Sequence, residues 1–132
     1  MTNQPMDVIV VTVPEEADVK QQQSFLRELA GRMSEYRPCI VLDCSRLSMM
    51  DGPRIYFLLC CLEEALRRNG DARLAGVPAP AKKVLQAAGA DRIFQMFASN
   101  GDAIGSFFPR LAVLERLEEA EDAENRIAQN AA

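Results

Sequence analysis

An acidic residue, a glycine, a proline and an arginine stand together just before a long apolar stretch: Asp51, Gly52, Pro53 and Arg54. Aspartate is a favoured N-cap residue, so this tetrapeptide is typical of the start of a helix. The first turn of a helix presents unpaired N–H groups and the positive end of the helix dipole, which favour anions and phosphorylated side chains. We therefore expect the functional surface of the protein to lie close to Asp51.

Two capping arrangements are compatible with these four residues. In one, the Asp51 carboxylate accepts a hydrogen bond from the Arg54 N–H, because Pro53 has no N–H to donate. In the other, Gly52 is the N-cap and Pro53 takes the favoured first helical position. Arg54 would lie against the positive end of the dipole at a cost of about 0.3–1 kcal/mol, which indicates an acidic partner or an anion nearby. The simpler alternatives are that Asp51 is only a helix cap and that Arg54 is a solvated first-turn residue.

Enzymatic chemistry has little support in the sequence. The chain contains no histidine, no Gly-rich phosphate loop and no nucleophile elbow. Asp43 and Asp51 are close together, but no general base accompanies them. The adjacent Cys60 and Cys61 cannot both point toward one metal ion. We therefore expect no catalytic residue, no metal, no cofactor, and cysteines that are reduced and buried.

The composition limits the class of protein further. The 132 residues fit one domain, and the formal net charge of -4 argues against nucleic acid as a partner. The apolar runs are too short to span a bilayer, so direct membrane insertion is not expected. Residues 1–5 lack the basic and apolar blocks of a signal peptide, so we expect a cytoplasmic protein.

Predicted strands and helices alternate along the chain. Apolar and β-branched runs predict strands at residues 6–13, 39–44, 72–77 and 93–97. Helical spacing and capping residues predict helices from Asp18 to near Tyr36, from the Asp51 region to Gly70, from Pro80 to Gly89 and from Asp102 to Phe108. This order predicts one α/β domain at residues 1–109, with a mixed, mostly parallel sheet flanked by helices. Residues 110–132 are expected to form an acidic helical extension, partly frayed at its end.

The predicted helix after Asp51 has an unusually wide apolar face. Its core stripe is expected to consist of Ile55, Leu58, Leu59, Leu62 and Leu66. Its flanks form either the margin of a broad core face or a surface that a partner covers, and they contain Tyr56, Phe57, Cys60 and Cys61. The next helix is expected to bury Val84, Leu85 and Ala88.

Three segments of the chain resemble the STAS domain family, the small α/β modules typified by bacterial anti-sigma factor antagonists. They are residues 41–51, 68–77 and 84–94. They are similar, in order and spacing, to the family's strand before its regulatory turn, its next helix end and strand, and its third helix. The resemblance implies a single STAS-like domain with a non-enzymatic role in signalling and transcription regulation.

The chain departs from the family's pattern at the regulatory turn. In the family, the aspartate that Asp51 resembles is usually followed by two hydroxyl residues and a glycine, and a partner kinase phosphorylates the second hydroxyl. Here those positions are Gly52, Pro53 and Arg54, and a proline ring carries no hydroxyl. The resemblance therefore implies a module that is not phosphorylated at the usual site. Ser45 and Ser48 in the preceding loop are weak substitute phosphoacceptors.

The resemblance also implies that the protein acts by binding another protein. The expected binding surface consists of Asp51, Gly52, Pro53, Arg54 and Tyr56. The expected partner is an anti-sigma factor or a related serine kinase-like protein, which would release the transcription factor that it holds. The alternative is an accessory subunit bound to the ATPase of an ABC transporter, where stable assembly replaces a phosphorylation switch. The wide apolar helix face leaves a homodimer open as well.

Overall fold

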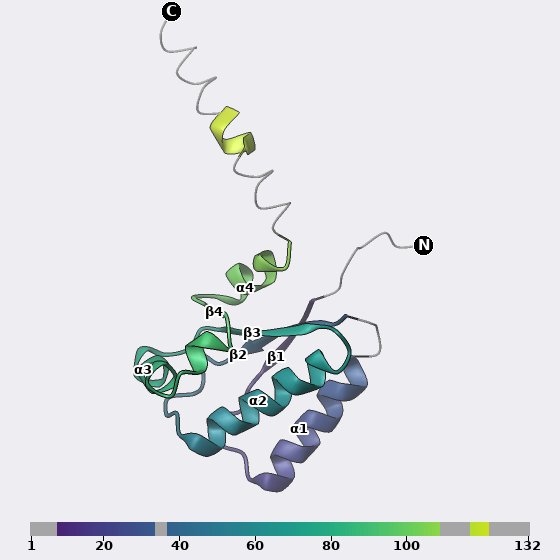
Figure 1. The fold of residues 1–132 in the computed structure, drawn as a ribbon, viewed down its shortest axis with the longest axis vertical. Coiled ribbons are helices and arrows are strands. Elements are labelled where there is room, and N and C mark those ends of the chain that lie inside the picture. The colour runs from purple at the N-terminus through teal and green to yellow at the C-terminus, as the bar shows by residue number, and fades with distance from the viewer. Residues whose placement is uncertain (1–7, 34–36, 109–116, 122–132) are drawn as a thin grey trace, which may run out of the picture.

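Strands and helices alternate along the described chain, as Figure 1 shows. The computed structural model describes residues 8–33, 37–108 and 117–121. The elements are, in order, β1 (Val8–Thr12), α1 (Val19–Arg32), β2 (Cys39–Asp43), α2 (Gly52–Leu66), β3 (Asp71–Ala75), α3 (Ala79–Ala87), the 3₁₀ turn η1 (Ala90–Arg92), β4 (Met96–Phe97) and α4 (Asn100–Ser106). The α/β class is confirmed. The predicted boundary near residue 109 and most of the predicted extension at 110–132 lie outside the described residues. Within that extension only residues 117–121 are described, and they are helical.

The strands form one sheet in the order β1-β2-β3-β4, and every described pairing is parallel. The mostly parallel sheet is confirmed, and no antiparallel strand occurs among the described residues. Val10 lies opposite Val41, and Val41 lies opposite Arg73, so the first three strands start and end together. We call the side where they start the amino end of the sheet and the other side the carboxyl end. The loops after β1 and β2 therefore meet at the carboxyl end.

Helices cover both faces of the sheet, with α1 and α2 below it and α4 above it in Figure 1. Because side chains alternate along a strand, Ile40 and Leu42 belong to the core with α1 and α2, whereas Cys39 and Val41 pack with α4. These four residues of β2 are all buried, as expected for a central strand covered on both faces. The main core lies on the α1 and α2 side and includes the fully buried Leu29, Leu47, Leu58, Leu74 and Leu85.

The buried face of α2 is rotated from the predicted one. It consists of Phe57, Leu58, Cys61, Leu62 and Ala65. The prediction was wrong for Leu66, which is 53% exposed, and Ile55 and Leu59 are only partly buried. The rotation places Phe57 edge-on to Phe25 of α1, with ring centroids 5.3 Å apart. The small side chains of Cys61 and Ala65 allow α2 to lie close to the sheet.

The segment after α3 forms a shorter strand than the predicted 93–97. Gly89 has a left-handed backbone with φ of 78°, and it leads from α3 into η1. This turn buries Phe94 but leaves Ile93 57% exposed. Only β4 at Met96–Phe97 then pairs with β3. The tertiary requirement to bury Phe94 has overridden the local preference for an extended strand.

The helix α3 buries a narrower face than predicted. Ala81 and Leu85, one turn apart, are buried, whereas Val84 and Ala88 are exposed. The helix is short, with nine residues, and its contact with the main core is made by this one i,i+4 pair, Ala81 and Leu85.

Helix caps were predicted correctly for α1 and incorrectly for α4. Asp18 and Gln21 form a reciprocal capping box, in which the Gln21 N–H donates to the Asp18 carboxylate at 2.7 Å. The helix ends at Arg32 rather than near residue 36. In α4 the N-cap is Ser99, whose hydroxyl accepts the Asp102 N–H at 3.1 Å, so the helix begins before the predicted Asp102.

Candidate functional site

Asp51 is the N-cap of α2. Its backbone is extended, with φ of -148° and ψ of 178°, and its Oδ1 accepts the Arg54 N–H at 3.0 Å. Gly52 is the first helical residue, and Pro53 occupies the first turn, where its missing N–H leaves no intrahelical bond unmade. Of the two predicted arrangements, the structure therefore adopts the one with Asp51 as the cap.

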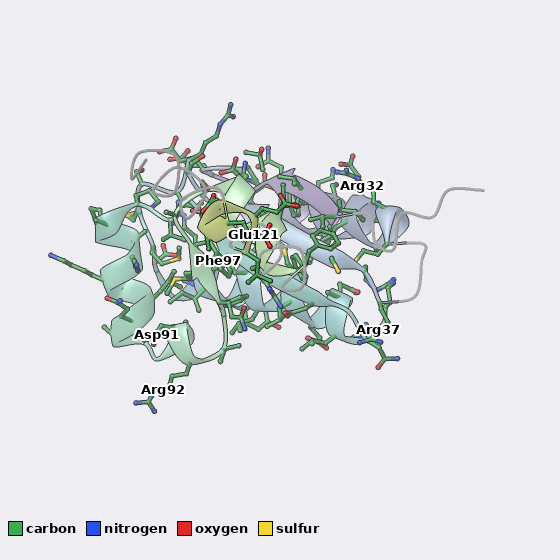
Figure 2. The ribbon with its side chains drawn as sticks, turned by 90° about the horizontal axis from the view of Figure 1, so that it is seen from above. Arg32, Arg37, Asp91, Arg92, Phe97 and Glu121 are labelled. Atoms are coloured by element: carbon green, nitrogen blue, oxygen red, sulfur yellow. The ribbon has the colours of Figure 1, made fainter. Side chains whose placement is uncertain are left out.

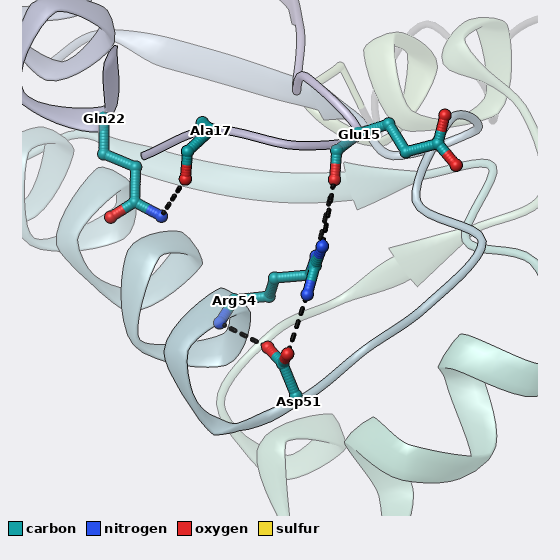
Figure 3. A network of polar contacts seen from close by, with 5 residues as sticks. All are labelled: Glu15, Ala17, Gln22, Asp51 and Arg54. Atoms are coloured by element: carbon teal, nitrogen blue, oxygen red, sulfur yellow. Dashed lines mark hydrogen bonds and ion pairs between the residues drawn. The ribbon is translucent and has the colours of Figure 1, made fainter. Parts of the chain in front are cut away.

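The Arg54 side chain is bound within the molecule. Its Nη1 forms an ion pair with Asp51 Oδ2 at 2.7 Å, and its Nε and Nη2 both donate to the Glu15 carbonyl oxygen at 3.4 Å (Figure 3). Each nitrogen of the guanidinium group thus has a partner. One carboxylate oxygen of Asp51 caps the helix and the other pairs with the Arg54 guanidinium group. The ion pair offsets the unfavourable free energy of a cation near the positive end of the helix dipole.

The loop between β1 and α1 completes this network. The Ser48 hydroxyl donates to the Glu15 carboxylate at 2.8 Å. Glu15 thus binds the β2–α2 loop through its side chain and α2 through its backbone. At the other end of the β1–α1 loop, the Gln22 side chain of α1 donates to the Ala17 carbonyl at 3.4 Å (Figure 3). The result is a connected chain of contacts, Ser48–Glu15–Arg54–Asp51, across three segments at the carboxyl end of the sheet.

A second polar contact holds the start of the β2–α2 loop. The Asp43 carboxylate accepts the Ser45 N–H at 3.0 Å and the Asn100 side-chain amide at 3.1 Å. Burial alone would raise the pKa of Asp43, but the hydrogen bonds from Ser45 and Asn100 outweigh it and hold the pKa below its ordinary value. Asp43 is therefore an ionised anchor for the loop and not a proton-transfer group.

Several residues next to this network are exposed. Gly52 and Pro53 are exposed, and Tyr56, one turn into α2, is 69% exposed. Met49, which sequence reasoning did not single out, is 57% exposed beside them in the chain. Asp51 and Arg54 lie partly buried at the base of this surface. The structure thus brings Asp51 to Arg54 together as one surface, with Tyr56 on the exposed side of the helix.

A small pocket of about 100 Å³ opens beside Pro53, between α2 and the β1–α1 loop. Val13, Leu47 and Phe57 line it and are buried members of the main core. Glu15 and Arg54 also line it. This volume is enough for about three water molecules or one aliphatic side chain. The pocket is too small for a nucleotide.

The thiols show no sign of reactivity at this site. The four cysteines form no disulfide. Burial raises the pKa of both Cys44 and Cys61 to about 12, so neither thiol ionises near neutral pH. Among residues 8–33, 37–108 and 117–121, no group of three or more carboxylate or cysteine side chains is arranged to hold a metal ion. Within the same ranges, no helix has the length and apolar character needed to cross a membrane.

Sequence reasoning did not find the role of Glu15. The acidic turn after β1 was visible, but Glu15 and Arg54 are 39 positions apart, and nothing local in the chain connects them. Parallel strand order could have supplied a signal, because the loops after neighbouring strands meet at the same end of a sheet.

Similar folds occur in solved structures of anti-sigma factor antagonist-like proteins. An anti-sigma-factor antagonist (STAS) domain protein from Planctomyces limnophilus has a TM-score of 0.61 and 14% identity, covering 74% of this chain and 87% of that one. A putative anti-sigma factor antagonist from Thermotoga maritima has a TM-score of 0.62 and 17% identity, covering 75% of this chain and 86% of that one. At these identities the likeness shows the fold alone.

A similar domain is also part of a much longer protein. The murine Solute Carrier 26 family member A9 anion transporter has a TM-score of 0.59 and 17% identity, covering 74% of this chain and 17% of the transporter. No curated protein sequence matches the chain. The family profile of the STAS domain matches residues 1–103, which is most of the sequence, and the chain therefore belongs to the STAS domain family.

Proposed function

We propose that this protein is a non-enzymatic regulatory module that binds a protein partner through Asp51, Gly52, Pro53, Arg54 and Tyr56. STAS domains are generally regulatory modules without catalytic activity. The partner is an anti-sigma factor or a related serine kinase-like protein, and binding releases the transcription factor that this partner holds. The proposed setting is the cytoplasm.

One observation carries this proposal. The network of Ser48, Glu15, Arg54 and Asp51 fixes the start of α2, while Pro53 and Tyr56 are exposed. A surface that is already ordered loses little conformational entropy on binding, so a larger share of its contact energy becomes affinity. An exposed tyrosine with a large apolar ring is a common anchor in protein interfaces.

The same surface has no hydroxyl at position 53 for a kinase to modify. A phosphoryl group there would add nearly two negative charges close to Asp51. Pro53 keeps this position uncharged and fixes its backbone. We infer that the module stays in one binding-competent state, and that its control rests on the amount of protein or on its partner.

Complex formation with kinase-type anti-sigma factors, with and without ATP, tests the proposal. We expect binding in both conditions and no phosphate on the protein by mass spectrometry. Tyr56→Ala should weaken binding about tenfold or more, as truncation of an interface anchor does. Leu66→Ala is the matched control, because Leu66 is a similarly exposed residue at the far end of the same helix. Equal weakening by both variants would contradict the proposed surface.

Phosphate on Ser48 or Ser45 in the same experiment would mean that the modification site has moved rather than disappeared. Both residues are exposed. Phosphorylated Ser48 would place its charge beside the Glu15 carboxylate and would disturb the network at its first contact.

The alternative is an accessory subunit bound to the ATPase of an ABC transporter. The likeness to a domain of a murine anion transporter is the observation that favours a transporter role. Affinity purification of the protein from its own cells distinguishes the two: a permease and an ATPase in the bound fraction support the transporter role, whereas an anti-sigma factor supports the first proposal.

A further inference from the structure

A second polar pocket lies at the amino end of the sheet, away from Asp51. Its volume is about 350 Å³, and its lining includes Arg37, Asn69, Asp71, Arg73, Ser106 and Phe107. These residues come from the α1–β2 loop, the α2–β3 loop, β3 and the end of α4. Seen from above in Figure 2, Arg37 lies at one end of the molecule and Arg92 near the other.

Arg73 is held rigidly on one side of this pocket. Its Nε donates to Asp71 Oδ2 at 3.2 Å, and its Nη1 donates to the Ser106 hydroxyl at 2.6 Å. The guanidinium carbon lies 4.1 Å from the centroid of the Phe107 ring. The side chain is only 17% exposed, yet its Nη2 has no hydrogen bond within the described residues. A fixed, poorly solvated arginine with an unused donor is suited to receive an acceptor oxygen.

The loops on the other side of the pocket have unusual backbone conformations. Arg37 and Asn69 are the two described non-glycine residues with positive φ, at 64° and 59°. Gly70 lies so close to Pro38 that any side chain at position 70 would collide with it. Such backbone conformations are found more often at functional sites than elsewhere. Here they fix the backbone of Arg37, whose exposed side chain forms no ion pair with a described residue.

Two arginines and, among the described residues, one acidic residue line this pocket. That acidic residue is Asp71, and its carboxylate is engaged by Arg73 and by the Ala72 N–H. Both arginines also act on the Cys39 thiol at the base of the pocket. Burial raises the pKa of Cys39, the charge of Asp71 also raises it, and the charges of Arg73 and Arg37 lower it. Arg37 and Arg73 thus line the same pocket as Cys39.

We propose that the pocket between Arg37 and Arg73 binds a small oxyanion, either phosphate or a carboxylate. The planar guanidinium group presents donors in the geometry of phosphate and carboxylate oxygens, which a chloride ion cannot use as fully. Arg73 Nη2 and the Arg37 side chain are the proposed donors to the anion. The Ser106 hydroxyl holds Arg73 in place by accepting a hydrogen bond from its Nη1. This site is independent of the proposed partner surface, because it lies at the opposite end of the strands.

Titration of the full chain with inorganic phosphate and, separately, with succinate tests the site. Binding is followed by the amide signals of Asn69 and Ser106 in NMR spectra, at constant ionic strength maintained with sodium chloride. We expect saturable shifts of these signals with at least one of the two anions. Saturable shifts with phosphate alone, with succinate alone or with both support the proposal and identify which kind of oxyanion the pocket binds. Chloride producing the same shifts, or no saturable shift with either anion, overturns it.

Arg37→Gln is the decisive variant, because the Arg37 side chain is exposed and forms no ion pair with a described residue, so its loss should leave the fold intact. It should weaken anion binding about tenfold or more, since hydrogen bonds to charged groups are the strong ones. Arg92→Gln is the matched control, an exposed arginine on η1. Unchanged binding in Arg37→Gln, or equal weakening in both variants, overturns the assignment. Thermal unfolding of Arg37→Gln without ligand verifies that the fold is intact.

Discussion

The two ends of the sheet each carry an arginine beside an aspartate, but the two arginines differ in what remains unpaired. At the carboxyl end, Arg54 uses Nη1 on Asp51 and both other nitrogens on the Glu15 carbonyl. At the amino end, within the part of the chain that the structure describes, Arg73 uses only Nε and Nη1, on Asp71 and Ser106. A fully paired arginine fixes the surface around it, whereas a partly paired one keeps a directed donor for a ligand. The same residue type thus contributes to the proposed protein-binding surface at one end and to the proposed anion pocket at the other.

Alanine substitutions of one glycine at each end, Gly70 and Gly52, should change the free energy of unfolding in opposite directions and give the largest expected difference between the two ends. Gly70 lies against Pro38, and a methyl group there would collide with the Pro38 carbonyl oxygen and ring. Gly70→Ala should therefore lower the free energy of unfolding by about 1–3 kcal/mol or more, as overpacking does. Gly52 is helical, and a methyl group added to it would meet no atom within 4 Å. Gly52→Ala should raise the free energy of unfolding by about 0.4–1 kcal/mol, because alanine has fewer unfolded conformations to lose.

Urea unfolding of both variants, followed by circular dichroism, measures these changes. If Gly70→Ala were as stable as the natural chain, the close contact between the two loops of the amino end would be wrong. The positions of Arg37 and Arg73 relative to each other would then lose their support.

Removing Asp51 tests the carboxyl end. Asp51→Ala loses both the cap and the ion pair, and the free energy of unfolding should fall by about 1–2 kcal/mol. Asp51→Asn keeps an oxygen for the Arg54 N–H and loses only a partly exposed ion pair, worth about 0.2–1 kcal/mol. Asp18→Ala, which removes the cap of α1, is the matched control without an ion pair. Equal losses in Asp51→Ala and Asp51→Asn would mean that the cap contributes nothing.

The fold could be predicted from the sequence because its signals are local. The apolar run Cys39 to Leu42, bounded by Pro38 and the loop after Asp43, has the composition of a central strand, and the capping box of Asp18 and Gln21 spans three positions. The errors arose where tertiary packing decides. On α2, several apolar faces were available, and contact of Phe57 with Phe25 selected one that leaves Leu66 in solvent. Residues 93–95, predicted as part of a strand, instead form a turn that buries Phe94.

The candidate site was predictable only in part, for the same reason. The bond from the Arg54 N–H to Asp51 spans one helical turn, so residue types and spacing predicted it as one of two capping arrangements. The contacts of Glu15 with Ser48 and Arg54 join positions 33 and 39 apart. The contact of Arg73 with Ser106 likewise spans 33 positions. Such contacts depend on strand order, which periodicity alone does not give.

The smallest expected effect concerns Asp43, whose carboxylate is held by hydrogen bonds from neutral groups. Burial favours its protonated form, but Ser45 and Asn100 lower its pKa in the folded protein below the ordinary value. A lowered folded-state pKa stabilises the protein above the unfolded-state pKa, near 3.8, and this contribution disappears as the pH falls through the folded-state value. The advantage of the natural chain over Asp43→Asn in free energy of unfolding should therefore be constant near neutral pH and shrink below about pH 4. Urea unfolding between about pH 7 and 2.5 measures it, with the exposed Asp91→Asn as control. An advantage independent of pH would show that Asp43 acts through shape rather than through its charge.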